Sequence, residues 1–145
     1  MPVNNAAMTA EKKVKGRKRH IVTDTLGCLL AVVVHAANIH DTKAGGQAVD
    51  RATDKYPTIV GICGDEGYRG SFEEYIGWQY DDVTVDISKR IKPEFEVLPK
   101  RWIVERTFAW FGNYRRLSKD FEVSVHSAEN MVIIANLHIL LKRIC

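Results

Sequence analysis

The sequence has few cysteines, no apolar leader and no apolar run long enough to cross a membrane. Its three cysteines are far apart and form no CxxC pair, so a zinc site built on thiolates is not expected. The N-terminal segment MPVNNAAMTA lacks the apolar core of a signal peptide. The most apolar stretch, Met131–Leu141, is interrupted by Asn136 and His138 and is too short to span a bilayer. These absences predict a cytoplasmic protein without a membrane partner, and an odd number of cysteines agrees with a reducing compartment.

The chain also lacks a strong excess of charge, because its net charge of +3 is only mildly basic. The basic residues are nevertheless clustered, with six against one acid in residues 11–20 and nine against three in residues 89–119. Such clusters are typical of phosphate contacts, although a run of lysines and arginines is also commonly a solvated surface. We favour phosphate contact for the first cluster because it adjoins a predicted strand. The candidate phosphate-contacting residues are Lys12, Lys13, Lys15, Arg17, Lys18, Arg19, Arg101, Arg106, Arg115 and Arg116.

The apolar pattern predicts one domain in which strands and helices alternate. Asp24 and Gly27 predict a tight turn that joins the first two strands into an antiparallel hairpin. A hairpin followed by alternating elements predicts an α/β fold, a mixed sheet with helices on both faces. The predicted strands are 17–24, 28–37, 58–64 and 83–87, and the predicted helices are 41–55, 70–79, 100–117 and 127–144, with Asp41, Ser71 and Ser127 as candidate N-caps.

Two segments show neither the helical nor the strand periodicity of apolar residues. Residues 1–11 are small and polar, so we expect them to be disordered. Residues 88–99 contain Pro93 and Pro99 and are expected to form a loop.

Asp65 is the most informative single residue. It ends a buried apolar strand and is followed by a glycine-containing turn, EGYRG. Ligands of open α/β sheets bind at the carboxyl ends of strands, so a carboxylate at this place can reach into a cleft. From its position alone, however, a cap of the following turn is the favoured role of Asp65.

Glu105 is the second candidate, within the predicted helix 100–117. Arg101 and Glu105 are four residues apart and share a helix face, which by itself predicts a surface ion pair of about 0.3–0.5 kcal/mol. The flanking aromatic residues suggest instead that the pair is partly buried against the sheet, where an acid without a task would be costly. The aromatic residues themselves are expected to belong to the core rather than to stack on unpaired bases. They are Trp102, Phe108, Trp110 and Phe111.

The five histidines do not cluster in the sequence. His35 and His138 lie in apolar runs and are expected to be hydrogen-bonded core residues, and metal ligation by the histidines is not expected. Asp41 and Asp50 are interpreted as a helix cap and a surface residue.

Three blocks of sequence closely resemble the DDE-type transposases of bacterial insertion sequences. They are KKVKGRKRHIVTDTLG (12–27), GDEGYRG (64–70) and KRWIVERTFAWFGNYRRLSKD (100–120), and the resemblance covers residues 12–144. It implies a ribonuclease-H-like catalytic domain, an endonuclease and strand-transfer activity on transposon ends, and thus DNA recombination near the nucleoid. Residue by residue, Asp65 matches the second acid of the family's triad and Glu105 the third, with Arg101 one turn before it.

The resemblance also implies a cofactor. In this family three acids hold two divalent metal ions, Mg²⁺ or Mn²⁺, for which hard oxygen ligands are suited. Two such ions ~4 Å apart activate a water or a 3′-hydroxyl and stabilise the leaving oxygen of an in-line displacement.

The chain departs from the family at the first acid, which the family carries on its first strand, upstream of the basic block. The nearest acid, Asp24, matches the hairpin turn and is not assigned this role. We therefore expect residues 12–145 to form a partial catalytic domain without its first strand, either N-terminally truncated or the downstream frame of a split transposase. Such a chain would be weak or inactive alone. Its expected partners are transposon and target DNA, an upstream-frame polypeptide and a second copy in a homodimer; the alternatives are a DNA-binding regulator or a decayed remnant.

Overall fold

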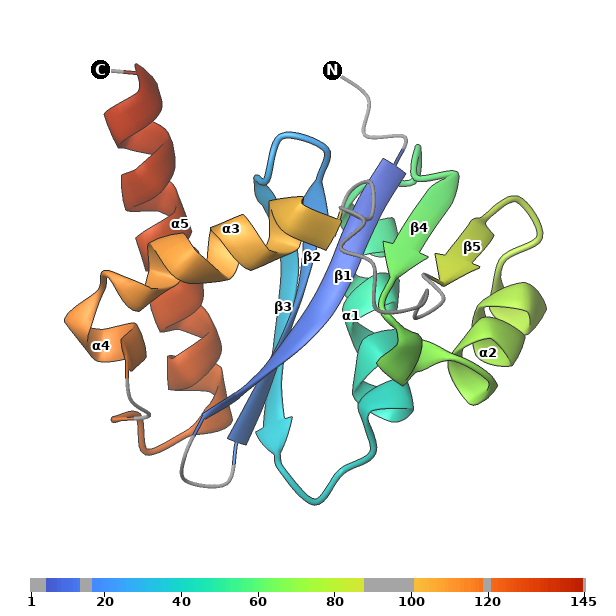
Figure 1. Cartoon of the computed structure of the whole chain (residues 1–145), viewed down its shortest axis with the longest axis horizontal. Helices are drawn as coiled ribbons and strands as arrows, with labels where there is room; N and C mark the ends of the chain where they lie inside the picture. Colours follow the sequence, from blue (N-terminus) through green and yellow to red (C-terminus); the bar gives the residue numbers. More distant parts are fainter. Residues whose placement is uncertain (1–4, 14–16, 88–100, 119–120, 145) are drawn as a thin grey trace, which may run out of the picture.

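The computed structural model describes residues 5–13, 17–87, 101–118 and 121–144 (Figure 1). A five-stranded mixed sheet lies at its centre, in the order β3-β2-β1-β4-β5. β1 pairs antiparallel with β2 and parallel with β4, while β2–β3 is antiparallel and β4–β5 is parallel. The strands are β1 (Asn5–Lys13), β2 (Arg17–Asp24), β3 (Leu29–Ala36), β4 (Gly61–Gly64) and β5 (Thr84–Ile87).

β1 corrects two predictions. Residues 5–11 were expected to be disordered and the sheet to lack its first strand, yet β1 is the central strand of the sheet. Ala6, Ala7 and Met8 are all at least 96% buried between the two flanking strands and the helices. Short side chains carry no hydrophobic periodicity, so the sequence pattern did not reveal a strand that is held by backbone pairing on both sides.

The β2–β3 hairpin forms as predicted. The Asp24 carboxylate accepts hydrogen bonds from the backbone N–H groups of Leu26 and Cys28, at 2.9 and 2.8 Å. Gly27 adopts the left-handed conformation with φ of 85°, which glycine accepts without strain. The turn therefore fixes the register of β2 against β3.

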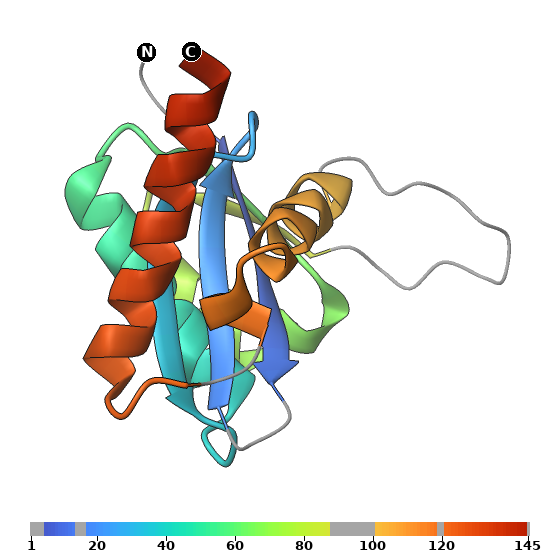
Figure 2. The same cartoon turned by 90° about the vertical axis from the view of Figure 1, so that its left-hand side faces the viewer.

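Helices cover both faces of the sheet, as Figure 2 shows. One core cluster lies between the sheet and helices α1 and α2, and a second lies between the sheet and helices α3, α4 and α5. Within the described residues, no helix is both long and apolar enough to cross a membrane. The helices are α1 (Asp41–Lys55), the 3₁₀ turn η1 (Glu66–Tyr68), α2 (Ser71–Gln79), α3 (Arg101–Gly112), α4 (Arg115–Ser118) and α5 (Val125–Ile144).

The helix boundaries differ from the predictions in detail. The predicted helix 100–117 is divided into α3 and α4, because the N–H groups of Asn113 and Tyr114 bond three residues back and tighten the end of α3. The predicted caps are each displaced: the structure has His40 as the N-cap of α1 and Gly70 as that of α2. At α5 the Ser124 hydroxyl accepts from the N–H of Ser127. The predicted loop 88–99 lies outside the described residues.

Candidate functional site

Asp65 lies directly after β4, at the carboxyl end of the strand as predicted. Its Oδ1 accepts a hydrogen bond from the N–H of Gly67 at 3.0 Å and caps η1. The carboxylate is partly exposed. The capping role is therefore present, and because the side chain keeps access to solvent, it does not preclude ligand binding.

Glu105 lies on α3, between buried Val104 and buried Thr107. Its side chain is exposed, so the expectation that it is partly buried against the sheet is wrong. α3 itself is anchored on the hairpin turn, since the Thr107 hydroxyl and the Arg106 guanidinium donate to the carbonyls of Gly27 and Leu26 at 3.2 and 3.0 Å. A fixed helix thus presents Glu105 to solvent.

The two acids flank the same strand. α3 packs over β1 and β2, and β1 is the parallel neighbour of β4, whose carboxyl end carries Asp65 (Figure 1). Met8 pairs with Gly64 in the register, so the next position of β1, Thr9, stands level with Asp65. The acid of β1 is Glu11, which pairs in register with Arg19 of β2. Residues 5–13 therefore place no aspartate beside Asp65.

The predicted phosphate-contacting residues of β2 have partners inside the chain. Lys18 forms an ion pair with Asp41 at 2.7 Å. Arg17 donates to the carbonyls of Glu122 and Val123 at 3.0 and 2.9 Å. Arg19 is 6% exposed, and its guanidinium donates to the carbonyl of Leu117 at 2.9 Å. These three residues hold β2 to α1, to α4 and to the segment before α5, and their contribution to a phosphate interface stays a prediction.

The basic residues of α3 and α4 are placed differently from one another. Arg106 stacks on the Trp110 ring, with 4.6 Å between the guanidinium carbon and the ring centroid, and Arg116 pairs with Glu122 at 2.6 Å. Arg115 is exposed and lines a hollow of about 260 Å³ beside α5. Lys15 and the side chains of Lys12, Lys13 and Arg101 lie outside the described part of the structure.

The aromatic residues largely follow the prediction of a core role. Phe111 is 1% exposed, and Phe108 packs against the same cluster. Trp110 is partly exposed. The guanidinium carbons of Arg106 and Arg143 lie over its ring, at 4.6 and 4.2 Å from the ring centroid. Cation–π contacts therefore hold a ring that the core buries only in part.

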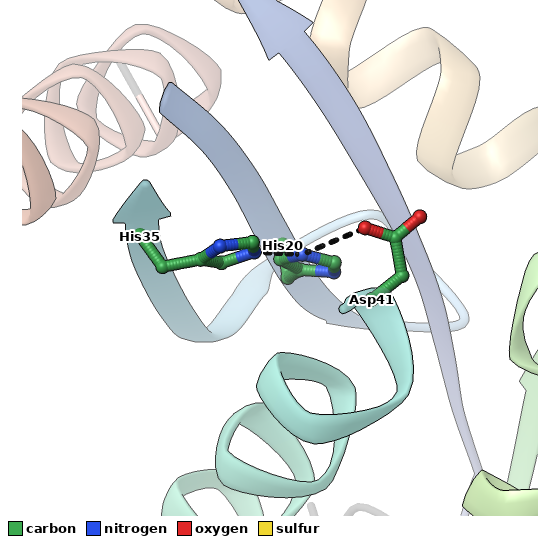
Figure 3. Close-up of side chains that lie close together, drawn as sticks. All are labelled: His20, His35 and Asp41. Atoms are coloured by element: carbon green, nitrogen blue, oxygen red, sulfur yellow. Dashed lines mark hydrogen bonds and ion pairs between the residues drawn. The ribbon is translucent and has the colours of Figure 1, made fainter. Parts of the chain in front are cut away.

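A second group of polar side chains lies on the α1 face of the sheet, where His20, His35 and Asp41 come together (Figure 3). The two imidazoles face each other with 2.5 Å between their Nε2 atoms, and His20 Nε2 is 3.9 Å from Asp41 Oδ1. Among the described residues, this is the one group of three or more His, Cys, Asp or Glu side chains close enough to share a metal ion. Tyr68 joins the group through a 2.6 Å hydrogen bond between its hydroxyl and His20 Nδ1.

Burial dominates the electrostatics of this group. It lowers the pKa of His20 to about 4, with a smaller effect from His35, so His20 is neutral at neutral pH. Burial also raises the pKa of Tyr68 above its usual value. Burial would raise the pKa of Asp41 too, but the hydrogen bond and charge of Lys18 outweigh it and hold that pKa below its usual value.

Sequence reasoning missed this group because its members are not neighbours in the chain. The available signal was the predicted hairpin. Once the turn at 24–27 fixes the antiparallel register, Lys18 pairs with His35 and His20 with Val33, which places the two histidines diagonally across two strands.

Two sequence comparisons match most of the chain. The profile of the family described as Transposase DDE domain matches residues 4–140. A protein of Burkholderia cepacia, assigned as the transposase of insertion sequence element IS402, is 33% identical over 127 residues, covering 78% of this chain. The alignment covers 58% of the Burkholderia protein, so the chain spans little more than half the length of that relative.

Solved structures with a similar fold are catalytic cores of integrases. The catalytic core domain of BIV integrase matches with a TM-score of 0.63 at 11% identity, covering 92% of this chain and 82% of that one. The HTLV-2 integrase catalytic core domain in complex with magnesium, in its dimeric form, gives a TM-score of 0.59 at 17% identity, with coverages of 92% and 85%. This likeness confirms the predicted ribonuclease-H-like mixed sheet.

Proposed function

The chain belongs to the transposase DDE domain family, and from this premise we propose that it supplies a catalytic domain for cutting and joining DNA at the ends of a transposable element. The observation that carries the proposal is the position of Asp65 at the carboxyl end of β4. β4 pairs with β1, and α3, the helix that carries Glu105, packs over β1. In a sheet of this kind the carboxyl ends of the strands are where ligands bind.

Asp65 and Glu105 would hold divalent metal ions, Mg²⁺ or Mn²⁺. Their donor set fits such ions, since both are carboxylates with access to solvent and offer hard oxygen ligands. When bound, the metal ions would supply activation of a water or a 3′-hydroxyl and stabilisation of the leaving oxygen. The role of this chain is to fix the two carboxylates on rigid elements, a strand end and an anchored helix.

We further propose that this polypeptide alone is weak or inactive. Thr9 stands level with Asp65 on β1 where an aspartate would complete the triad, and the acid of β1 is Glu11. The proposed remedy is an upstream-frame polypeptide that provides the first aspartate on a strand that takes the place of β1 beside β4. The proposed contacts to DNA phosphates are exposed Arg115 together with Lys12, Lys13, Lys15 and Arg101.

The test is nicking of a labelled transposon end in Mg²⁺ or Mn²⁺, by the chain alone and with the upstream polypeptide. We expect little cleavage alone and restored cleavage in the mixture, abolished by Asp65→Ala or Glu105→Ala. Glu66→Gln is the matched control, because Glu66 is an exposed acid beside Asp65, and it should leave cleavage unchanged. Strong cleavage by the chain alone, abolished by Asp65→Ala, would refute the proposal that its catalytic triad is incomplete. Cleavage that survives both alanine variants would refute the site.

The same samples separate the alternatives of a regulator and a remnant. A DNA-binding regulator would hold DNA in a filter-binding assay, with an affinity that falls steeply with salt, yet would not cut in any mixture. A decayed remnant would neither bind at low salt nor cut.

A homodimer is the last part of the proposal. α5 exposes a row of large apolar side chains whose exposed fractions lie between 45% and 81%: Ile133, Ile134, Leu137, Leu141 and Ile144. Contiguous apolar surface of this kind marks an interaction site. We expect a dimer mass in light scattering and a monomer for Leu137→Glu; Val60→Glu, at a similarly exposed position away from α5, should remain dimeric.

A further inference from the structure

We propose that His20, His35 and Asp41 form a binding site for a transition-metal ion, with Zn²⁺ as the ion they suit. The site is separate from the carboxylates of Asp65 and Glu105, and the proposal does not rest on transposase activity. His20 comes from β2, His35 from β3 and Asp41 from the first residue of α1 (Figure 3).

The first argument is where the ring nitrogens point. His20 Nε2 and His35 Nε2 are 2.5 Å apart, the ring centroids are 4.6 Å apart and the planes differ by 22°. The ring planes are nearly parallel, and the two Nε2 atoms are much closer to each other than the ring centres are, so the Nε2 edges of the two rings face each other. The carboxylate of Asp41 lies beside these edges, with all three ligand atoms within 4.8 Å of one another.

The second argument is the occupation of the other ring nitrogens. His35 Nδ1 lies 2.7 Å from the carbonyl oxygen of Ala36, and His20 Nδ1 lies 2.6 Å from the hydroxyl of Tyr68. Histidines that bind metals usually donate their second N–H to a carbonyl or a similar group, which fixes the tautomer and the ring orientation. Both supporting contacts are present here, and both histidines are at least 95% buried.

The hydrogen bonds define the state without metal. A carbonyl can only accept, so His35 carries its proton on Nδ1 and presents a lone pair at Nε2. His20 must then donate from Nε2, and its Nδ1 accepts from the Tyr68 hydroxyl. A metal ion would replace the proton between the two Nε2 atoms: His20 moves that proton to Nδ1 and donates to the Tyr68 oxygen. No proton is lost from the pair.

The geometry requires modest movement. Bonds of about 2.0–2.1 Å in a tetrahedral site put ligand atoms roughly 3.3 Å apart. The two Nε2 atoms, now 2.5 Å apart, must therefore separate by roughly 0.8 Å, and Asp41 Oδ1, now 3.9 Å from His20 Nε2, must approach it by roughly 0.6 Å. The two rings must also tilt so that both lone pairs meet at the ion. Asp41 is able to move because its side chain is 32% exposed, and a water from the same side would complete the four ligands. Lys18, at 2.7 Å from Asp41 Oδ1, competes with the ion.

The donor set selects the class of ion. Imidazole nitrogens suit Zn²⁺ and its neighbours, whereas Mg²⁺ prefers all-oxygen sites. Binding also has a structural consequence, because Tyr68 both contacts His20 and donates its backbone N–H to the carbonyl of Asp65 at 3.1 Å. An ion at this site would therefore stiffen the turn that carries Asp65.

The test is a titration of the metal-free full chain with Co²⁺, a spectroscopic substitute for Zn²⁺, in excess Mg²⁺ to fill oxygen sites. We expect one Co²⁺ per chain, a visible absorption typical of tetrahedral Co²⁺ without a thiolate charge-transfer band, and displacement by Zn²⁺. Asp41→Asn should weaken binding by about tenfold or more, and so should Tyr68→Phe through loss of the supporting contact. Lys18→Met should tighten it.

Two controls make the result decisive. Asp54→Asn changes the same charge on the exposed face of α1 and should bind Co²⁺ like the parent, as should Asp65→Asn. Asp41 and Lys18 are not buried, so their variants should fold, as circular dichroism would verify. Absence of a saturable spectrum, a thiolate band, or equal affinities for the Asp41→Asn and Asp54→Asn variants would each overturn the proposal.

Discussion

Single residues at the tip of the β2–β3 hairpin connect the sheet to α3. Gly27 combines a φ of 85° with crowding, since a Cβ atom there would lie 3.0 Å from Arg106 Nη2 and 3.2 Å from Thr107 Oγ1. Those two side chains donate to the carbonyls of Leu26 and Gly27. The position of the helix that carries Glu105 thus depends on a glycine in a turn.

We predict that Gly27→Ala lowers the free energy of unfolding by about 1–2 kcal/mol, because alanine is strained at positive φ and displaces the α3 contacts. Urea denaturation would measure this. Gly77→Ala is the matched control: Gly77 lies in α2 with open space around it, so alanine should stabilise by about 0.5–1 kcal/mol. Equal effects of the two substitutions would show that the turn is not strained.

Pairs of elements are joined by a few buried or partly buried carboxylates. Glu129 of α5 accepts from the N–H of Val34 on the edge strand β3 at 3.0 Å and pairs with Arg51 of α1 at 3.0 Å. Asp50 of α1 accepts from the hydroxyls of Tyr75 and Tyr80, which lie in and just after α2. These contacts hold helices of both layers to each other and to the sheet edge.

For Glu129 we expect Glu129→Ala to cost about 1–3 kcal/mol of unfolding free energy, because the Val34 N–H is left buried without its acceptor. Glu129→Gln keeps an acceptor oxygen and loses only the ion pair with half-exposed Arg51, so it should cost less than about 1 kcal/mol. Both values come from chemical denaturation. If the two variants were equally destabilised, the ion pair rather than the covered strand edge would be the stabilising contact.

For Asp50 the prediction concerns alkaline pH. The hydrogen bond to Asp50 raises the pKa of Tyr75 to about 12, above an unfolded value of about 10. The unfolded chain therefore loses this proton first. The stability contributed by the pair is complete below about pH 10 and is lost as pH rises towards 12. Asp50→Asn should lower the pKa of Tyr75 towards 10 in a tyrosinate absorbance titration. The Tyr75→Phe variant identifies which transition belongs to Tyr75. Asp54→Asn is the control and should leave that transition unchanged.

The whole molecule depends on β1, which joins two differently built halves of the sheet. On one side it continues the antiparallel β2–β3 hairpin, and on the other it begins the parallel β4–β5 pair. Ala6 and Met8 contribute to the core under α1, and Ala7 contributes to the core under α3. Loss of this strand would leave two open sheet edges.

We predict that Ala7→Pro costs about 3 kcal/mol or more and raises hydrogen exchange in both halves together, because proline cannot donate within a strand paired on both sides. Ala37→Pro is the control. Ala37 is the second residue of a turn in which Ile39 N–H bonds to the Ala36 carbonyl, a place where proline is favoured. Exchange raised in only one half by Ala7→Pro would show that the halves fold independently.

Local features were predictable from the sequence, and features set by distant partners were not. The β2–β3 hairpin and α1 follow from the turn residues Asp24 and Gly27 and from apolar spacing, all within one stretch of chain. β1 has no such pattern, and its place is set by pairing with β4 far along the sequence. Asp65 was placed correctly because a strand end is a local feature. The exposure of Glu105 and the meeting of His20 with His35 depend on packing and register.

The position of β1 also bears on the order in which the chain folds. β1 and β2, like β2 and β3, are close together in the sequence, whereas Asn5 pairs with Gly61 across the intervening hairpin and α1. Pairing between distant segments is slow because the loop entropy must be lost before the contacts form. We expect the β1–β4 ladder to close late in refolding. Asp65 comes directly after that ladder, so a nascent chain would place the carboxylate proposed to bind metal only as folding finishes.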